Sequence, residues 1–67
     1  MKFIISTHTG ADGVRLSRPG HFGNMPFATD VEAVAHARSL AGKELLVIER
    51  ERYRAVRSLK HNREELA

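Results

Sequence analysis

The sequence predicts a small α+β fold: an antiparallel-type sheet of three strands, covered by one helix and followed by a basic C-terminal helix. Three observations lead to this prediction. Two β-favouring segments flank a glycine-rich turn near the N-terminus, a helix-capping signal precedes residues 30–41, and residues 45–48 are all apolar. The chain has 67 residues and no cysteine. It is therefore expected to form one domain, residues 1–67, with a small core, because a chain of this length buries only about 60% of its unfolded surface.

The first expected unit is a β-hairpin. Phe3, Ile4 and Ile5 form a compact apolar run, and residues 14–18 alternate apolar and polar side chains, as a half-exposed strand does. Residues 9–13 contain two glycines, which accept a positive φ, and so predict the turn.

Residues 19–26 are predicted to form a loop, with at most a short extended piece, because they begin with Pro-Gly and end with proline. A domain with few large apolar groups has none to spare for the surface. We therefore expect three large side chains in and beside this loop to fold back onto the core: Phe22, Met25 and Phe27.

Residues 30–41 carry the clearest local signal, that of a helix. Thr29 is placed to cap its N-terminus, and Glu32, three residues later, to return a bond to the Thr29 amide. Gly42 suits the position after the last turn. The face expected to lie on the sheet consists of small and branched side chains: Val31, Val34, Ala37 and Ala41.

A strand at about 44–49 is expected at the centre of the sheet. Its four consecutive apolar residues, 45–48, show no polar alternation, which indicates burial on both faces. Charged residues begin at Glu49, where the strand is expected to leave the core.

Residues 50–66 fit two structures. As a helix, the segment has only a thin apolar stripe, formed by Val56, Leu59 and Leu66. As a strand, it would place the glutamates and the arginines of its first part on opposite faces. We predict a helix from about residue 52, because no Gly, Pro, Asn or Asp between 49 and 61 offers a turn.

The positive charge of the chain gathers in this C-terminal segment. The formal net charge is +3, and residues 52–63 contain five basic side chains and no acidic one. Such a patch suits an anionic partner, although a solvated helix face has the same pattern. The predicted partner-binding residues are Arg50, Arg52, Tyr53, Arg54, Arg57, Lys60 and Arg63.

Neither a catalytic centre nor a metal or cofactor site is predicted. No two of the four histidines are closer than 13 residues, and there is no cysteine, so the local spacings of metal ligands are missing. His8, Asp12 and His21 would have to converge around the hairpin turn to form a site. The serines lack the context of a nucleophile, and a domain this small encloses a typical ligand pocket only with difficulty.

We therefore expect a non-enzymatic protein-binding module, a small accessory factor or inhibitor of the kind that phages and mobile elements encode. It would dock its basic C-terminal surface onto a larger protein or ribonucleoprotein complex with an acidic surface. The alternative is direct nucleic-acid binding by the same face, with Tyr53 stacking on bases rather than packing against the core.

Three further expectations concern the setting of the protein. No segment approaches the roughly 20 apolar residues of a membrane helix, so a membrane partner is not expected. A cytoplasmic location is the default. A homodimer would supply burial that so small a core lacks.

Overall fold

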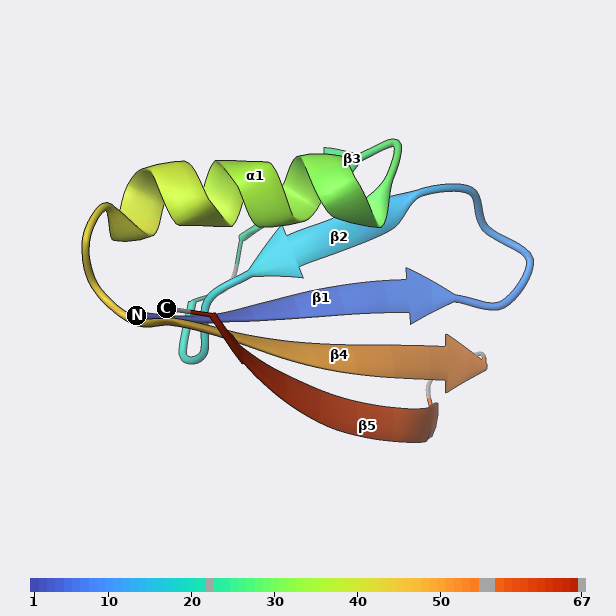
Figure 1. The fold of residues 1–67 in the computed structure, drawn as a ribbon. Coiled ribbons are helices and arrows are strands. Elements are labelled where there is room, and N and C mark those ends of the chain that lie inside the picture. The colour runs from blue at the N-terminus through green and yellow to red at the C-terminus, as the bar shows by residue number, and fades with distance from the viewer. Residues whose placement is uncertain (22, 55–56, 67) are drawn as a thin grey trace.

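A five-stranded sheet with one helix lying across it makes up the described part of the chain in the computed structural model (Figure 1). The structure describes residues 1–21, 23–54 and 57–66, and their side chains at 1–21, 23–53 and 63–66. The elements are β1 (Lys2–His8), β2 (Val14–Ser17), β3 (Asn24–Phe27), α1 (Asp30–Ala41), β4 (Leu46–Arg54) and β5 (Arg57–Leu66). The predicted α+β class is confirmed. The sheet, in the order β3-β2-β1-β4-β5, is mixed rather than antiparallel, because β1 and β4 run parallel.

β1 and β2 form the predicted N-terminal hairpin. Ile5 stands opposite Leu16 in antiparallel register, and both side chains are buried in the core. The turn requires glycine at position 13, where φ is +79° and a Cβ would lie 2.5 Å from the carbonyl oxygen of Phe27. The glycines of this segment therefore have the turn function that the sequence indicates.

β3 is an edge strand in the segment for which the sequence predicts a loop. It pairs antiparallel with β2, and as an edge strand it accepts Pro26, because the backbone groups on its outer side have no partner strand. Phe27 packs against the core as expected, whereas the expectation for Met25 is wrong, since its side chain is 47% exposed. Phe22 lies outside the described residues.

α1 has the predicted bounds and the predicted N-terminal cap. The side-chain oxygen of Thr29 accepts a hydrogen bond from the Glu32 amide at 3.2 Å. The Glu32 carboxylate accepts one in return from the Ala28 amide, one residue before the expected donor. After the last turn, the Gly42 amide donates to the carbonyl oxygen of Arg38 at a positive φ of 61°.

The helix packs on the sheet through alanines. Ala33, Ala37 and Ala41 are buried, and Val34 lies partly buried against the same core. The expectation for Val31 is wrong, because its side chain is 76% exposed. The spacing of four residues puts three small side chains on one face, so the helix backbone lies close to the strands.

β4 lies between β1 and β5, so it is an interior strand, whereas β1 holds the central position of the sheet. The expectation that residues 45–48 are all buried is wrong for Leu45, which is 50% exposed. Leu46 and Ile48 are fully buried, and the strand extends beyond the predicted end near residue 49 to Arg54. α1 returns the chain to the edge of the sheet where β1 begins, so β4 starts beside β1 and runs in the same direction (Figure 1). Such a crossover allows neighbouring strands to be parallel.

The predicted C-terminal helix from about residue 52 is wrong. Residues 52–54 continue β4, and residues 57–66 form β5, which pairs antiparallel with β4. Residues 55 and 56, which fall where the sequence disfavours a turn, lie outside the described residues.

Residues 57–66 gain more contacts as a paired strand than a helix with a thin apolar stripe would give them. Strand pairing supplies β5 with backbone hydrogen-bond partners along β4, and it sets Arg63 opposite Glu49. Leu66 packs against the core at the end of the strand.

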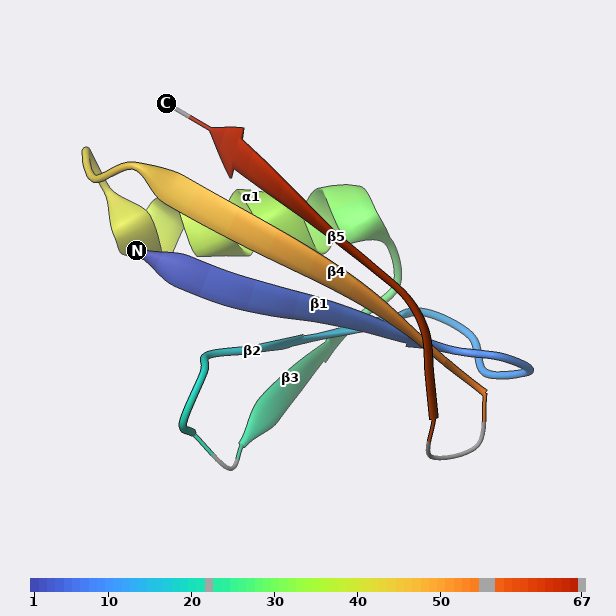
Figure 2. The same cartoon turned by 90° about the horizontal axis from the view of Figure 1, so that it is seen from below.

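The two faces of the sheet differ. α1 covers the core face, whose buried strand residues are Phe3, Ile5, Leu16, Leu46 and Ile48. Figure 2 shows the other face, which no described element covers. On this uncovered face, Lys2 Nζ lies 2.5 Å from Glu49 Oε1.

Candidate functional site

Four of the predicted partner-binding residues meet at the far end of the β4–β5 pair. The antiparallel register sets Arg52 opposite Lys60 and Arg54 opposite Arg57, with a register shift between Arg52 and Tyr53. We term Arg52, Arg54, Arg57 and Lys60 the basic ribbon end. For the last three, the structure describes the backbone, and their side chains lie outside the described part.

The basic ribbon end concentrates positive charge on neighbouring strand positions. Like charges directly opposite each other on antiparallel strands are destabilising. Residues 52–63 contain no acidic residue, and the carboxylate of the preceding Glu51 accepts a hydrogen bond from the Tyr53 hydroxyl. An anionic partner bound there would lower the electrostatic free energy of the segment.

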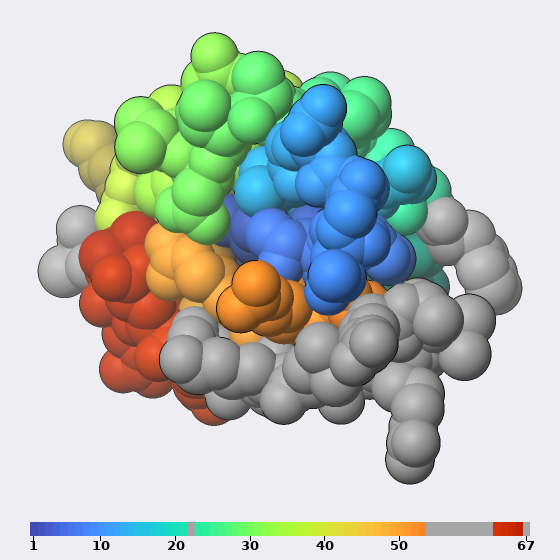
Figure 3. Space-filling model, turned by 90° about the vertical axis from the view of Figure 1, so that its right-hand side faces the viewer, coloured from blue at the N-terminus to red at the C-terminus, as the bar shows by residue number. Residues whose placement is uncertain are grey.

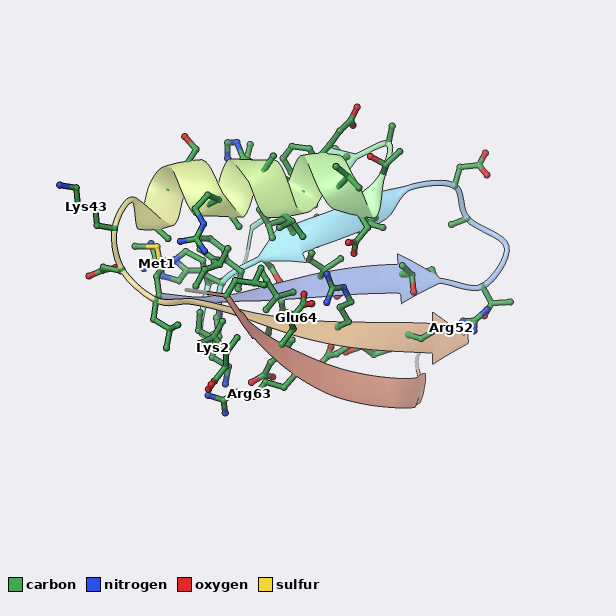
Figure 4. The ribbon with its side chains drawn as sticks, in the orientation of Figure 1. Met1, Lys2, Lys43, Arg52, Arg63 and Glu64 are labelled. Carbon is green, nitrogen blue, oxygen red and sulfur yellow. The ribbon has the colours of Figure 1, made fainter. Side chains whose placement is uncertain are left out.

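Arg52 is the residue of the basic ribbon end whose side chain can be followed. It is exposed, and it forms no ion pair or hydrogen bond with another described residue. Figure 4 shows it at the end of β4, next to the turn that follows β1.

Arg50 faces the helix side of the sheet instead. Its Nε lies 3.0 Å from Asp30 Oδ1, and its Nη1 lies 2.8 Å from Glu64 Oε1. The hydrogen bonds that it donates to Asp30 and Glu64 raise the pKa of Arg50 above its ordinary value. The structure therefore separates Arg50, already paired with two carboxylates, from the basic ribbon end.

Tyr53 lies half-buried on the uncovered face rather than in the core. Its ring stacks on His8, with ring centres 5.4 Å apart and planes inclined by 20°. Its hydroxyl donates a hydrogen bond to Glu51. This hydrogen bond, together with desolvation, raises the pKa of Tyr53 above its ordinary value of 10.0.

Arg63 stands toward the other end of β5, opposite Glu49. Its side chain is 57% exposed, and its Nη2 lies 3.2 Å from Glu65 Oε1. Figure 4 shows Arg63 close to Lys2 below the sheet, away from Arg52. The seven predicted residues thus occupy four separate places on the β4–β5 pair: the basic ribbon end and the positions of Arg50, Tyr53 and Arg63.

A cleft beside Arg52 was not predicted from the sequence. It has a volume of about 490 Å³ and lies between Arg52 and the strand end and turn from residue 7 to residue 13. The only sequence feature that pointed to this place was the pair of glycines in the turn, Gly10 and Gly13. Their relation to Arg52 depends on the parallel pairing of β1 with β4, which local sequence patterns do not reveal.

Two properties of the described residues bear on other kinds of site. Within them, no three His, Asp or Glu side chains gather in a way that would hold a metal ion. His8 ends β1, whereas His21 lines a cavity with Phe3 at the other end of that strand.

No helix in the described part of the chain has the length and apolar character needed to cross a membrane.

Comparison of the chain with protein-family models, with curated proteins and with solved structures finds no match.

Proposed function

We propose that the protein is a non-enzymatic binding module, acting as an accessory factor or inhibitor. It docks the basic ribbon end onto an acidic surface of a larger protein or ribonucleoprotein complex. The observation that supports this proposal most is the strand register, which places Arg52 opposite Lys60 and Arg54 opposite Arg57. Like charges at directly opposed strand positions repel each other, and an acidic surface that approached them would offset this repulsion.

Other cations of the sheet support this choice of surface. Lys2, Arg50 and Arg63 each have a carboxylate within 3.2 Å, so their charge is largely neutralised inside the domain. Arg52 has no such partner among the described residues, and neither has Arg15 on β2, but Arg52 alone of the two stands opposite another cation, Lys60. Unneutralised charge is what steers an oppositely charged partner toward one face.

Tyr53 favours a protein partner over nucleic-acid bases. One face of its ring is stacked against His8, and its hydroxyl is bonded to Glu51. The Glu51 carboxylate bonded to the hydroxyl would repel a phosphate backbone that approached the ring.

Direct nucleic-acid binding is the second candidate, and the shape of the β4–β5 pair favours it. Residues 52–54 and 57–60 form a two-stranded antiparallel ribbon rather than a helix. The major groove of DNA admits a two-stranded ribbon, and the cations of the basic ribbon end would contact phosphates.

The deciding experiment is capture of partners from a lysate, with and without nuclease, by three forms of the full chain. These are the wild type, a double variant with Arg54→Glu and Arg57→Glu, and a control with Arg18→Glu and Lys43→Glu. Both variants lower the net charge by the same amount. The control residues are exposed and lie near the opposite end of the molecule, where Figure 4 labels Lys43.

We expect the wild type and the control to retain the same protein in stoichiometric amount after nuclease treatment, and the Arg54/Arg57 variant to lose it. Retention by all three forms would show that the basic ribbon end is not the docking surface. A bound set that disappears with nuclease would instead support the nucleic-acid candidate. Its affinity should then fall steeply with salt, since each neutralised phosphate releases counterions.

A further inference from the structure

After β1 and after β4, the chain turns to opposite sides of this strand pair. These strands are parallel neighbours, so their carboxyl ends lie at the same edge of the sheet. From β1 the chain turns toward β2, and from β4 it continues to β5 on the other side (Figure 1). In open α/β sheets, ligands bind in the crevice that such divergence leaves outside the carboxyl ends, and here turns to antiparallel strands take the place of the helices.

The cleft of about 490 Å³ occupies this position. Arg52 and the chain from residue 7 to residue 13 line it, with the exception of Asp12. Figure 3 looks onto this edge and shows the turn that follows β1 beside the end of β4. A backbone hydrogen bond of 2.8 Å, from the Thr9 amide to the carbonyl oxygen of Tyr53, joins the two strand ends. Such cross-strand bonding holds the two walls in place.

The groups that line the cleft are suited to an anion. Arg52 contributes a guanidinium that is unpaired among the described residues. Thr9, which is exposed, contributes a hydroxyl group, whereas the Thr7 hydroxyl donates to the carbonyl oxygen of Glu51 and the His8 ring is stacked on Tyr53. No described carboxylate is part of the lining. Arg52 comes from β4 and Thr9 from the turn after β1, so the two groups lie on the two walls of the cleft.

We propose that this cleft binds the phosphate group of a small phosphomonoester, with Arg52 as its charged anchor. The planar guanidinium matches two phosphate oxygens, and the Thr9 hydroxyl on the other wall of the cleft is a donor for a third. The volume of about 490 Å³ falls in the range of pockets for small organic ligands, so the organic part of the ligand has room beside the phosphate. The proposal goes beyond the proposed function, because the ligand is a small molecule.

The test is a titration of the full chain, followed through its amide chemical shifts in two-dimensional NMR spectra. The probes are inorganic phosphate and glycerol phosphate, each compared with chloride at the same ionic strength. We expect saturable shifts confined to residues 7–13 and Arg52, with glycerol phosphate binding more tightly than inorganic phosphate. Arg52→Gln should weaken binding by about tenfold, the effect of removing one charge-assisted donor. Arg63→Gln, a matched loss of an exposed arginine away from the cleft, should leave the affinity unchanged.

Shifts that rise without saturation, or that spread over basic residues throughout the chain, would overturn the proposal. So would equal affinities in Arg52→Gln and Arg63→Gln. The experiment is separate from partner docking: saturation by phosphate in a chain that captures no macromolecule would support the cleft and count against the docking surface. Partner capture without phosphate saturation would support the docking surface and count against the cleft.

Discussion

Arg50 of β4 and Asp30 at the start of α1 form a two-point ion pair. Nε lies 3.0 Å from Oδ1, and Nη2 lies 3.1 Å from Oδ2. The remaining nitrogen, Nη1, reaches Glu64 Oε1 on β5 at 2.8 Å. A single side chain thus joins α1, the interior strand β4 and the edge strand β5, and planar bidentate pairing of this kind is the strongest geometry open to arginine.

Replacement of Arg50 by glutamine is expected to lower the free energy of unfolding by about 1–2 kcal/mol. Two carboxylates lose their charged donor, and the partial exposure of the group limits the loss. Urea unfolding followed by circular dichroism measures the change. Arg52→Gln is the control, because that exposed side chain has no described partner, and it should change the same quantity by less than about 0.5 kcal/mol. Equal losses in both variants would contradict a stabilising role for the Arg50 ion pairs.

The elements that the sequence predicted correctly are those with local signals. The cap at Thr29 and the glycine at position 42 act within one helical turn, so α1 could be located to the residue. The N-terminal hairpin likewise depends on a turn of a few residues. Such patterns require no knowledge of what lies across the sheet.

The elements that the sequence missed depend on distant pairing. β3 has too few apolar residues to be recognised alone, and its pairing with β2 defines it. β5 carries a pattern compatible with helix or strand, and only the pairing of Leu66 with Leu46 and of Arg63 with Glu49 distinguishes them. Tertiary context overrides weak local preference in such segments.

In the candidate site too, the features with a local sequence signal could be predicted and those that depend on distant strand pairing could not. The charge of residues 52–63 could be read from the sequence. That Arg50 faces the helix and Tyr53 the uncovered face follows from strand alternation, which a helical prediction hides. The cleft required the parallel register that brings His8 alongside Tyr53.

Replacement of Ala37 by leucine should destabilise the fold by about 1–3 kcal/mol, because the close approach of α1 to the sheet leaves no room for a larger side chain. Ala37 is fully buried. Thermal or urea unfolding measures the loss. Ala35→Leu is the matched control in the same helix, since Ala35 is exposed, and it should leave stability nearly unchanged. Similar losses at both positions would show that helix packing on the sheet is not tight.

Replacement of Gly13 by alanine should cost more stability than replacement of Gly20. Both glycines have a positive φ, +79° and +80°, but a Cβ at Gly13 would meet the Phe27 carbonyl oxygen at 2.5 Å, while one at Gly20 would meet nothing within 4 Å. The backbone conformation alone accounts for a loss of about 1 kcal/mol, so the excess measured for Gly13→Ala in urea unfolding reports the steric clash. Equal losses would mean that the strand carrying Phe27 moves aside without cost.

Titration of Tyr53 offers a direct check on its contact with Glu51. Tyr53 is the only tyrosine, and the chain has no tryptophan, so the absorbance change on phenol ionisation reports this residue alone. We expect its pKa to lie above 10.0, chiefly because of the hydrogen bond to Glu51. Glu51→Gln provides a weaker, uncharged acceptor and should bring the pKa back toward its ordinary value. Glu65→Gln, which removes an exposed carboxylate from β5, should not.

The raised pKa also sets the direction of a pH effect on stability. The folded state binds the phenol proton more tightly than the unfolded state, so the stabilisation is fully present below the unfolded pKa of about 10 and is lost as the pH rises through the folded value. The free energy of unfolding should therefore fall in strongly alkaline solution, and by less in Glu51→Gln than in the wild type. Urea unfolding at a series of pH values measures both. A wild-type pKa at the ordinary value, together with identical alkaline profiles for the two proteins, would show that the Tyr53–Glu51 hydrogen bond does not persist in solution.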